Sequence, residues 1–158
     1  MAYLKPKRES TQAEVQARME RYCAYQDRCH AEVREKLKDF SLTTEEKENI
    51  ICSLIEGRFL DEERFARSFA RGKFRVKQWG RVRICRELRA RGIHPRLLEV
   101  ALSEIDEREY DEVFRSLLEA KKKETGELTT RTQVAKVYNF MVSKGYETEK
   151  VWEALNVK

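Results

Sequence analysis

The most constraining feature of this chain is an internal repeat of helix-forming segments. Three segments, which begin at Val33, Ile84 and Val137, align after shifts of 51 and then 53 residues, with apolar residues at matching positions. Each has the pattern of a helix, a short turn and a second helix, and a further helical segment precedes each pair. We therefore predict an all-α fold of three tandem three-helix repeats. The predicted parts are a flexible basic N-terminal tail over 1–12 and repeats over 13–60, 61–108 and 109–158.

The repeats also predict how the chain folds as a whole. A unit of about fifty residues buries little apolar surface by itself, so neighbouring units must pack on one another as in other helical-repeat proteins. This reasoning predicts an elongated, slightly curved body. The first helix of each unit is expected over 13–28, 61–77 and 109–123.

The turns and helix starts carry recognisable local signals. Gly92 and Gly145 can adopt the left-handed conformation that ends a helix, whereas the first unit has Ser41-Leu42 there, so its helix end is either sterically strained or bends differently. The helix-start signals are capping threonines and a first-turn proline. They fall at Thr43, Pro95, Thr130 and Thr148.

Positive charge is concentrated in the middle of the chain. Residues 64–96 hold twelve Lys or Arg and one acid, Glu87, while the remaining residues carry a net negative charge. On the expected helices, arginines lie apart from apolar stripes, which are Phe65, Phe69 and Val76 on one helix and Ile84, Cys85 and Leu88 on the next. Such a one-signed surface favours contact with a polyanion or an acidic protein. The alternative is an ordinary solvated helical surface.

Trp79 and Gly80 follow the basic run and leave two interpretations open. The indole can stack on a nucleobase or on a partner, or it packs over the junction between helices while Gly80 permits the turn. We favour packing, which is the usual role of a large aromatic residue.

The sequence contains no recognisable catalytic or metal-binding motif. It lacks a phosphate-binding glycine loop, a zinc-protease motif and a nucleophile elbow, so we expect a protein that is not an enzyme and needs no cofactor or metal. His94 is expected to cap a helix, and the acids at 61–63 to favour a helix N-terminus. The four cysteines, Cys23, Cys29, Cys52 and Cys85, are expected to be buried free thiols inside helices. No apolar run is long enough for a membrane span or a secretory signal, and we expect a cytoplasmic protein.

The central segment resembles the signature of the RecX family, bacterial regulatory proteins that modulate RecA recombinase. The matching residues include Phe59-Leu60-Asp61, Arg64-Phe65-Ala66, Trp79-Gly80, Ile84, Glu87-Leu88 and Gly92-Ile93. The flanking stretches "AEVREKL" and "KGYETEKVWEAL" are also similar to the family's repeats, so the resemblance covers nearly the whole chain after the tail. It departs from the family pattern at Ser41-Leu42, Arg91 and His94.

This resemblance implies three three-helix repeats and a non-enzymatic inhibitor of RecA. It implies that the protein lodges in the helical groove of the RecA–DNA filament and contacts both RecA and single-stranded DNA, with weaker binding to duplex DNA. We expect it to act as a monomer. Charge position alone selects the candidate DNA- and RecA-binding residues. They are Arg64, Arg67, Arg71, Lys73, Arg75, Lys77, Arg81, Arg83, Arg86 and Arg89.

Two other functions are compatible with a basic helical repeat. One is a helix-turn-helix regulator that acts directly on duplex DNA, although the basic unit occurs once and no dimerisation heptad is visible. The other is a helical scaffold without affinity for nucleic acid.

Overall fold

The chain forms two compact helical units. The computed structural model describes residues 6–7 and 9–156, which contain nine helices and no strand. The first unit holds the first three helices, the chain up to Phe65 and the short segment Arg91–Ile93; the second holds Ala66–Ala90 and the chain from His94 onward. The helices are α1 (Gln12–Tyr25), α2 (His30–Leu37), α3 (Thr44–Glu56), α4 (Glu62–Lys77), α5 (Arg81–Ala90), α6 (Pro95–Leu102), α7 (Glu107–Thr125), α8 (Arg131–Lys144) and α9 (Thr148–Asn156). The all-α prediction is confirmed.

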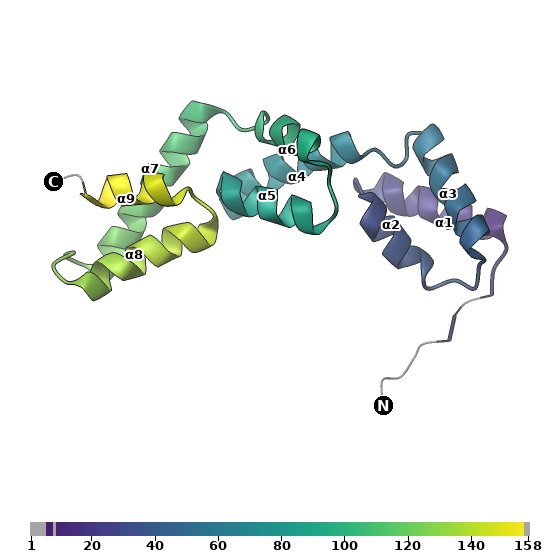
Figure 1. Ribbon diagram of the computed structural model, residues 1–158, viewed down its shortest axis with the longest axis horizontal. Helices are drawn as coiled ribbons and strands as arrows, with labels where there is room; N and C mark the ends of the chain where they lie inside the picture. Colours follow the sequence, from purple (N-terminus) through teal and green to yellow (C-terminus); the bar gives the residue numbers. More distant parts are fainter. Residues whose placement is uncertain (1–5, 8, 157–158) are drawn as a thin grey trace. The chain divides into compact units, whose positions relative to one another are not determined.

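In the first unit α1 and α2 both pack on α3 (Figure 1). A core of apolar side chains between these helices holds the unit together. Val15, Met19 and Cys23 lie one turn apart on α1, and they meet Ile50 and Leu54 of α3 in one cluster. All five are at most 4% exposed. Spacing of four residues places them on one face of each helix, which explains why these segments fold as amphipathic helices.

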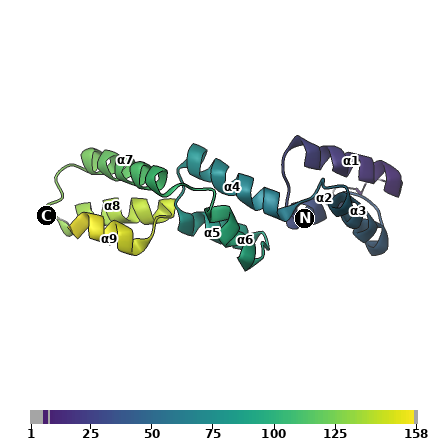
Figure 2. The same ribbon diagram turned by 90° about the horizontal axis from the view of Figure 1, so that it is seen from above.

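A chain of aromatic rings forms the centre of the second unit. The Tyr110 ring lies 5.8 Å from the Phe74 ring and 5.3 Å from the Tyr146 ring, measured between centroids, and Tyr146 contacts Phe114 at 5.4 Å. These residues come from α4, α7 and the turn before α9. Helix α7 lies beside α8 and α9, as Figure 2 shows from above. The rings therefore tie α4 to the last three helices.

Two glycines allow the turn before α5 to touch the turn after α8. The Gly80 amide donates to the Lys144 carbonyl at 2.8 Å, and the Val82 amide donates to the Gly145 carbonyl at 2.9 Å. A Cβ atom on Gly80 would lie 2.3 Å from the Gly145 oxygen, so no side chain fits. Gly80 is thus required for close backbone approach. The positive φ of this turn falls on Gln78 instead (56°).

Most predicted helix signals are confirmed. Thr43 and Thr130 cap α3 and α8 through their hydroxyls, Pro95 begins α6, and His94 caps it by accepting from the Arg96 amide. Gly92 and Gly145 have positive φ angles. Thr148 was expected to be a cap but is the first residue of α9.

Several sequence expectations need correction. Val76 is 77% exposed, because the buried stripe of α4 runs through Ala66, Ala70 and Phe74. Cys52 is exposed, and Cys29 precedes α2 instead of lying inside a helix. The predicted tail, residues 1–12, lies partly outside the described residues, and Gln12 already belongs to α1.

Candidate polyanion-binding surface

Five of the ten candidate arginines and lysines are paired with carboxylates of the chain itself. In the first unit, Arg64 Nε donates to Asp27 Oδ1 at 2.7 Å. In the second unit, Arg67 and Arg71 both reach Glu104, and Arg75 lies 4.0 Å from Glu109. Arg81 contacts Glu107 and Glu147. These guanidinium groups do not form one continuous unpaired surface, contrary to the simplest interpretation of the charge run.

Glu104 sits between two arginines of α4. The Arg67 Nη1 and Arg71 Nη1 atoms lie 2.9 Å and 3.0 Å from its two oxygens. Hydrogen bonds from Arg67 and then Arg71 hold the pKa of the Glu104 carboxyl below its usual range. The carboxylate is therefore charged at neutral pH and neutralises part of the positive field of α4.

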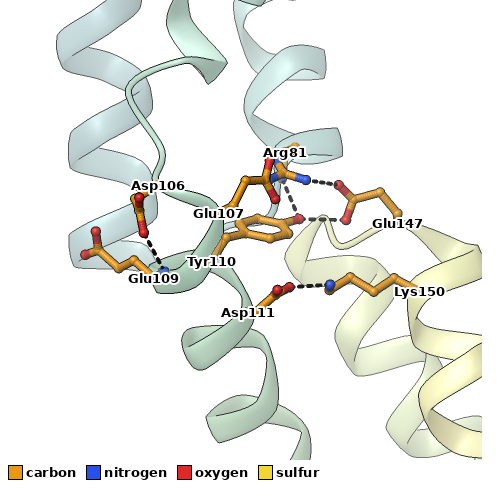
Figure 3. Close-up of polar contacts among 8 residues, drawn as sticks. All are labelled: Arg81, Asp106, Glu107, Glu109, Tyr110, Asp111, Glu147 and Lys150. Atoms are coloured by element: carbon orange, nitrogen blue, oxygen red, sulfur yellow. Dashed lines mark hydrogen bonds and ion pairs between the residues drawn. The ribbon is translucent and has the colours of Figure 1, made fainter.

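Arg81 belongs to a partly buried polar network at the junction of α5, α7 and α9 (Figure 3). Its guanidinium lies 3.9 Å from the centre of the Tyr110 ring, and the Tyr110 hydroxyl donates to Glu147 at 2.7 Å while accepting from the Arg81 amide at 3.2 Å. Burial first, and then the hydrogen bond with Glu147, raise the pKa of Tyr110 above its usual value. Lys150 and Asp111 form a second ion pair at 2.5 Å beside it.

This network assigns Arg81 a structural role, since its side chain is engaged by three residues of the second unit. Sequence reasoning missed the network because its members are 26 to 66 residues apart. The exposed acids Asp106 and Glu109, also visible in Figure 3, belong to the N-terminal cap of α7, where Asp106 accepts from the Glu109 amide.

Two of the remaining cations lie against the indole of Trp79. Lys73 Nζ lies 5.1 Å from the centre of the indole ring and Arg83 Cζ lies 4.2 Å from it, so the indole joins the basic residues of α4 to those of α5. Lys77 follows Lys73 by one helical turn, and Arg86 and Arg89 follow Arg83 at three-residue intervals, which places neighbours side by side on each helix. We call the set of Lys73, Lys77, Trp79, Arg83, Arg86 and Arg89 the Trp79 surface.

The Trp79 surface differs from the paired cations in its electrostatics. No ion pair to Lys73, Lys77, Arg86 or Arg89 is seen within the described part of the chain, and Lys77, Arg86 and Arg89 are exposed. Arg83 is half-buried; its Nη1 donates to the Ser143 carbonyl at 3.2 Å. Trp79 packs edge-on against Phe69, which agrees with the packing interpretation. The Trp79 surface is thus a positive region that the acids of the described residues leave available.

The part of the chain that the structure describes shows no metal centre. Within residues 6–7 and 9–156 there is no cluster of three or more side chains that could ligate a metal ion. The described helices also lack the length and apolar character that a membrane crossing requires. Helical-repeat proteins commonly present extended binding surfaces to other macromolecules.

Comparisons with known proteins identify the family. Residues 61–102 match the family model described as RecX, second three-helix domain. A regulatory protein RecX from Prosthecochloris aestuarii is 30% identical over 138 residues, which are 85% of this chain and 87% of that protein. The chain belongs to the RecX family of regulatory proteins.

Other relatives agree in sequence and in fold. A regulatory protein RecX from Lactobacillus delbrueckii subsp. bulgaricus is 25% identical over 80% of this chain, which spans 46% of that longer relative. A crystal structure of regulatory protein RecX has a TM-score of 0.79 with 25% identity, over 91% of this chain and 70% of that one. RecX from Lactobacillus salivarius has a TM-score of 0.78 with 21% identity, over 92% and 96% of the two chains, and shows the same fold.

Proposed function

We propose that this protein binds the RecA–single-stranded-DNA filament and inhibits the recombinase and ATPase activities of RecA by lodging in the filament groove. Membership of the RecX family supports a regulatory role. The observation that carries the proposal is the Trp79 surface, where Lys77, Arg86 and Arg89 are exposed without carboxylate partners in the described residues. Phosphates and acidic loops of a filament are the ligands that such cations bind.

The rigid attachment of the Trp79 surface supports this mechanism. The contact between Gly80 and Gly145 and the aromatic chain around Tyr110 hold α4 and α5 against the last three helices. A surface fixed in this way can span neighbouring groups of a filament without losing much conformational entropy on binding. Binding across neighbouring subunits would hinder filament extension or ATP cycling. The protein contributes no chemistry of its own, and the ATP belongs to RecA.

The direct test is the single-stranded-DNA-dependent ATPase of RecA, with strand exchange as a second readout. Substoichiometric amounts of this protein should slow both reactions. Unchanged rates at equimolar protein would contradict the proposal.

The helix-turn-helix alternative is less consistent with the composition of α6. In such a motif the second helix enters the major groove and its N-terminal residues contact base edges. Here the second helix is α6, with the sequence PRLLEVAL and one basic residue, Arg96. A sequence-specific footprint on duplex DNA would favour the alternative, whereas binding that ignores sequence and prefers single strands favours the filament.

A further inference from the structure

The first unit contains an open groove whose walls are strongly basic. The groove has a volume of about 920 Å³ and lies between α1, the loop after it and the end of α2. One acid, Asp39, contributes to it, and Lys36 lies 3.5 Å from that carboxylate. The basic residues of the lining are Lys7, Arg18, Arg21, Arg28, Lys36 and Lys38.

Aromatic rings alternate with these cations. The Arg28 guanidinium lies 3.8 Å from the centre of the Tyr22 ring, and the Arg18 guanidinium lies 6.0 Å from that of Phe40. Tyr25 differs from both rings because it is 84% exposed and has no ring contact within the described residues. The Tyr25 ring is therefore accessible to a ligand.

The helical spacing places these groups in one row. Arg18 and Tyr25 each lie three or four residues from both Arg21 and Tyr22, so the four residues share one face of α1. From Arg18 to Tyr25 this face spans about 10 Å at 1.5 Å per residue. Arg18 and Arg21 are exposed, and no ion pair to either is present in the described part of the chain. A row of unpaired arginines that ends in an exposed aromatic ring combines phosphate binding with base stacking.

We propose that this groove is a second nucleic-acid site, in which Arg18 and Arg21 bind the phosphates of a single strand and Tyr25 stacks on one of its bases. The inference rests on the proposed function in taking the strand to be that of the filament, but it concerns a different surface, in the first unit. A strand fits better than an acidic peptide, because stacking on Tyr25 and planar guanidinium groups suit a base and a phosphate together.

The test measures binding of the full chain to a fluorescently labelled oligothymidylate by anisotropy over a range of salt concentrations. Tyr25→Ala should weaken binding about fivefold or more, the loss expected for one stacked base, while Tyr25→Phe should bind like the parent protein. Arg18→Gln with Arg21→Gln should reduce the salt slope by about 1.4, since each phosphate contact to a single strand contributes about 0.7. Because these side chains are exposed, helicity by circular dichroism should stay unchanged.

A control of equal charge separates a site from general electrostatics. Arg34→Gln with Lys47→Gln removes two positive charges from the same unit outside the groove, and should change the slope less than the groove pair does. Equal effects of the two pairs, or parental affinity of Tyr25→Ala, would overturn the inference. Competition by polyglutamate as strong as by unlabelled oligothymidylate would also overturn it, in favour of an acidic protein partner.

The outcome can be separated from that of the proposed function. If the groove variants bind DNA normally while the parent protein still inhibits the RecA ATPase, the groove inference alone fails. If the parent protein does not inhibit RecA while the groove variants still lose DNA binding, the proposed function alone fails.

Discussion

Replacing Glu104 by glutamine should strengthen the dependence of DNA binding on salt. In the parent protein the Glu104 carboxylate oxygens lie 2.9 Å from Arg67 Nη1 and 3.0 Å from Arg71 Nη1. The Arg71 side chain is 40% exposed, so solvent and a polyanion can reach its guanidinium once the carboxylate is gone. Exposed ion pairs are weak, so the fold should tolerate the change.

The magnitude follows from counting phosphates. Each phosphate neutralised on a single strand contributes about 0.7 to the slope of log K against log salt. Release of Arg71 should therefore steepen the slope by about 0.7. Between 50 and 200 mM salt, this difference makes the affinity of Glu104→Gln fall roughly 2.6-fold further than that of the parent. The lowered pKa keeps Glu104 charged at neutral pH. Its carboxylate therefore remains paired with the arginines of α4 in the parent protein under the conditions of this assay.

Glu99→Gln is the matched control, measured by the same anisotropy titration. Glu99 is an exposed residue of α6 without an ion pair in the part of the chain described by the structure, and its replacement changes the net charge equally. Identical slopes for the two variants would refute the reasoning, because they would show that Arg71 does not reach DNA when Glu104 is replaced.

Three further predictions concern the fold. Gly80→Ala should lower the free energy of unfolding by about 1–3 kcal/mol or more, because the new Cβ would overlap the Gly145 carbonyl. Gly72→Ala, which has open space around its Cβ position, should raise the free energy of unfolding by about 0.5–1 kcal/mol. Urea unfolding measures both changes, and equal effects of the two variants would contradict the packing at Gly80. The pKa of Tyr110 is raised in the folded state, so its contribution to stability is present below its ordinary pKa of 10.0 and lost as pH rises above it; Tyr110→Phe should flatten the alkaline loss of stability, and an unchanged profile would argue against the network. Cys52 should be the one fast-reacting thiol of the native protein, since burial raises the pKa of the other three, and Cys52→Ser should abolish the fast phase of a thiol-reagent assay.

The sequence was sufficient to predict the features that depend on near neighbours. Helical periodicity and the repeat predicted the helices, and hydroxyl caps such as Thr43 depend on contacts three residues away. The prediction that Val76 belongs to the buried stripe of α4 was wrong, because two faces of that helix carry apolar residues and only tertiary packing selects the buried one. The division into three units and the curvature of the body stay predictions.

The candidate site was harder to predict, because its electrostatics depend on residues far apart in the chain. Glu104 lies 37 residues from Arg67, so no local charge count reveals the pairing. Similarly, the acidic residues of the first unit offset its basic residues in any count of charge, so the sequence did not reveal the basic groove beside Tyr25. A row of Arg18, Arg21 and Tyr25 at helical spacing was the signal available in the sequence.

Charge reversal on the Trp79 surface tests the central claim most directly. The variant Lys77→Glu, Arg86→Glu, Arg89→Glu is compared in the RecA ATPase assay with Lys123→Glu, Arg131→Glu, Lys136→Glu, which reverses three exposed charges on α7 and α8. Loss of inhibition by the first variant, with inhibition retained by the second and helicity retained by both, is the predicted result. Full inhibition by the first variant would contradict the claim that this surface binds the filament.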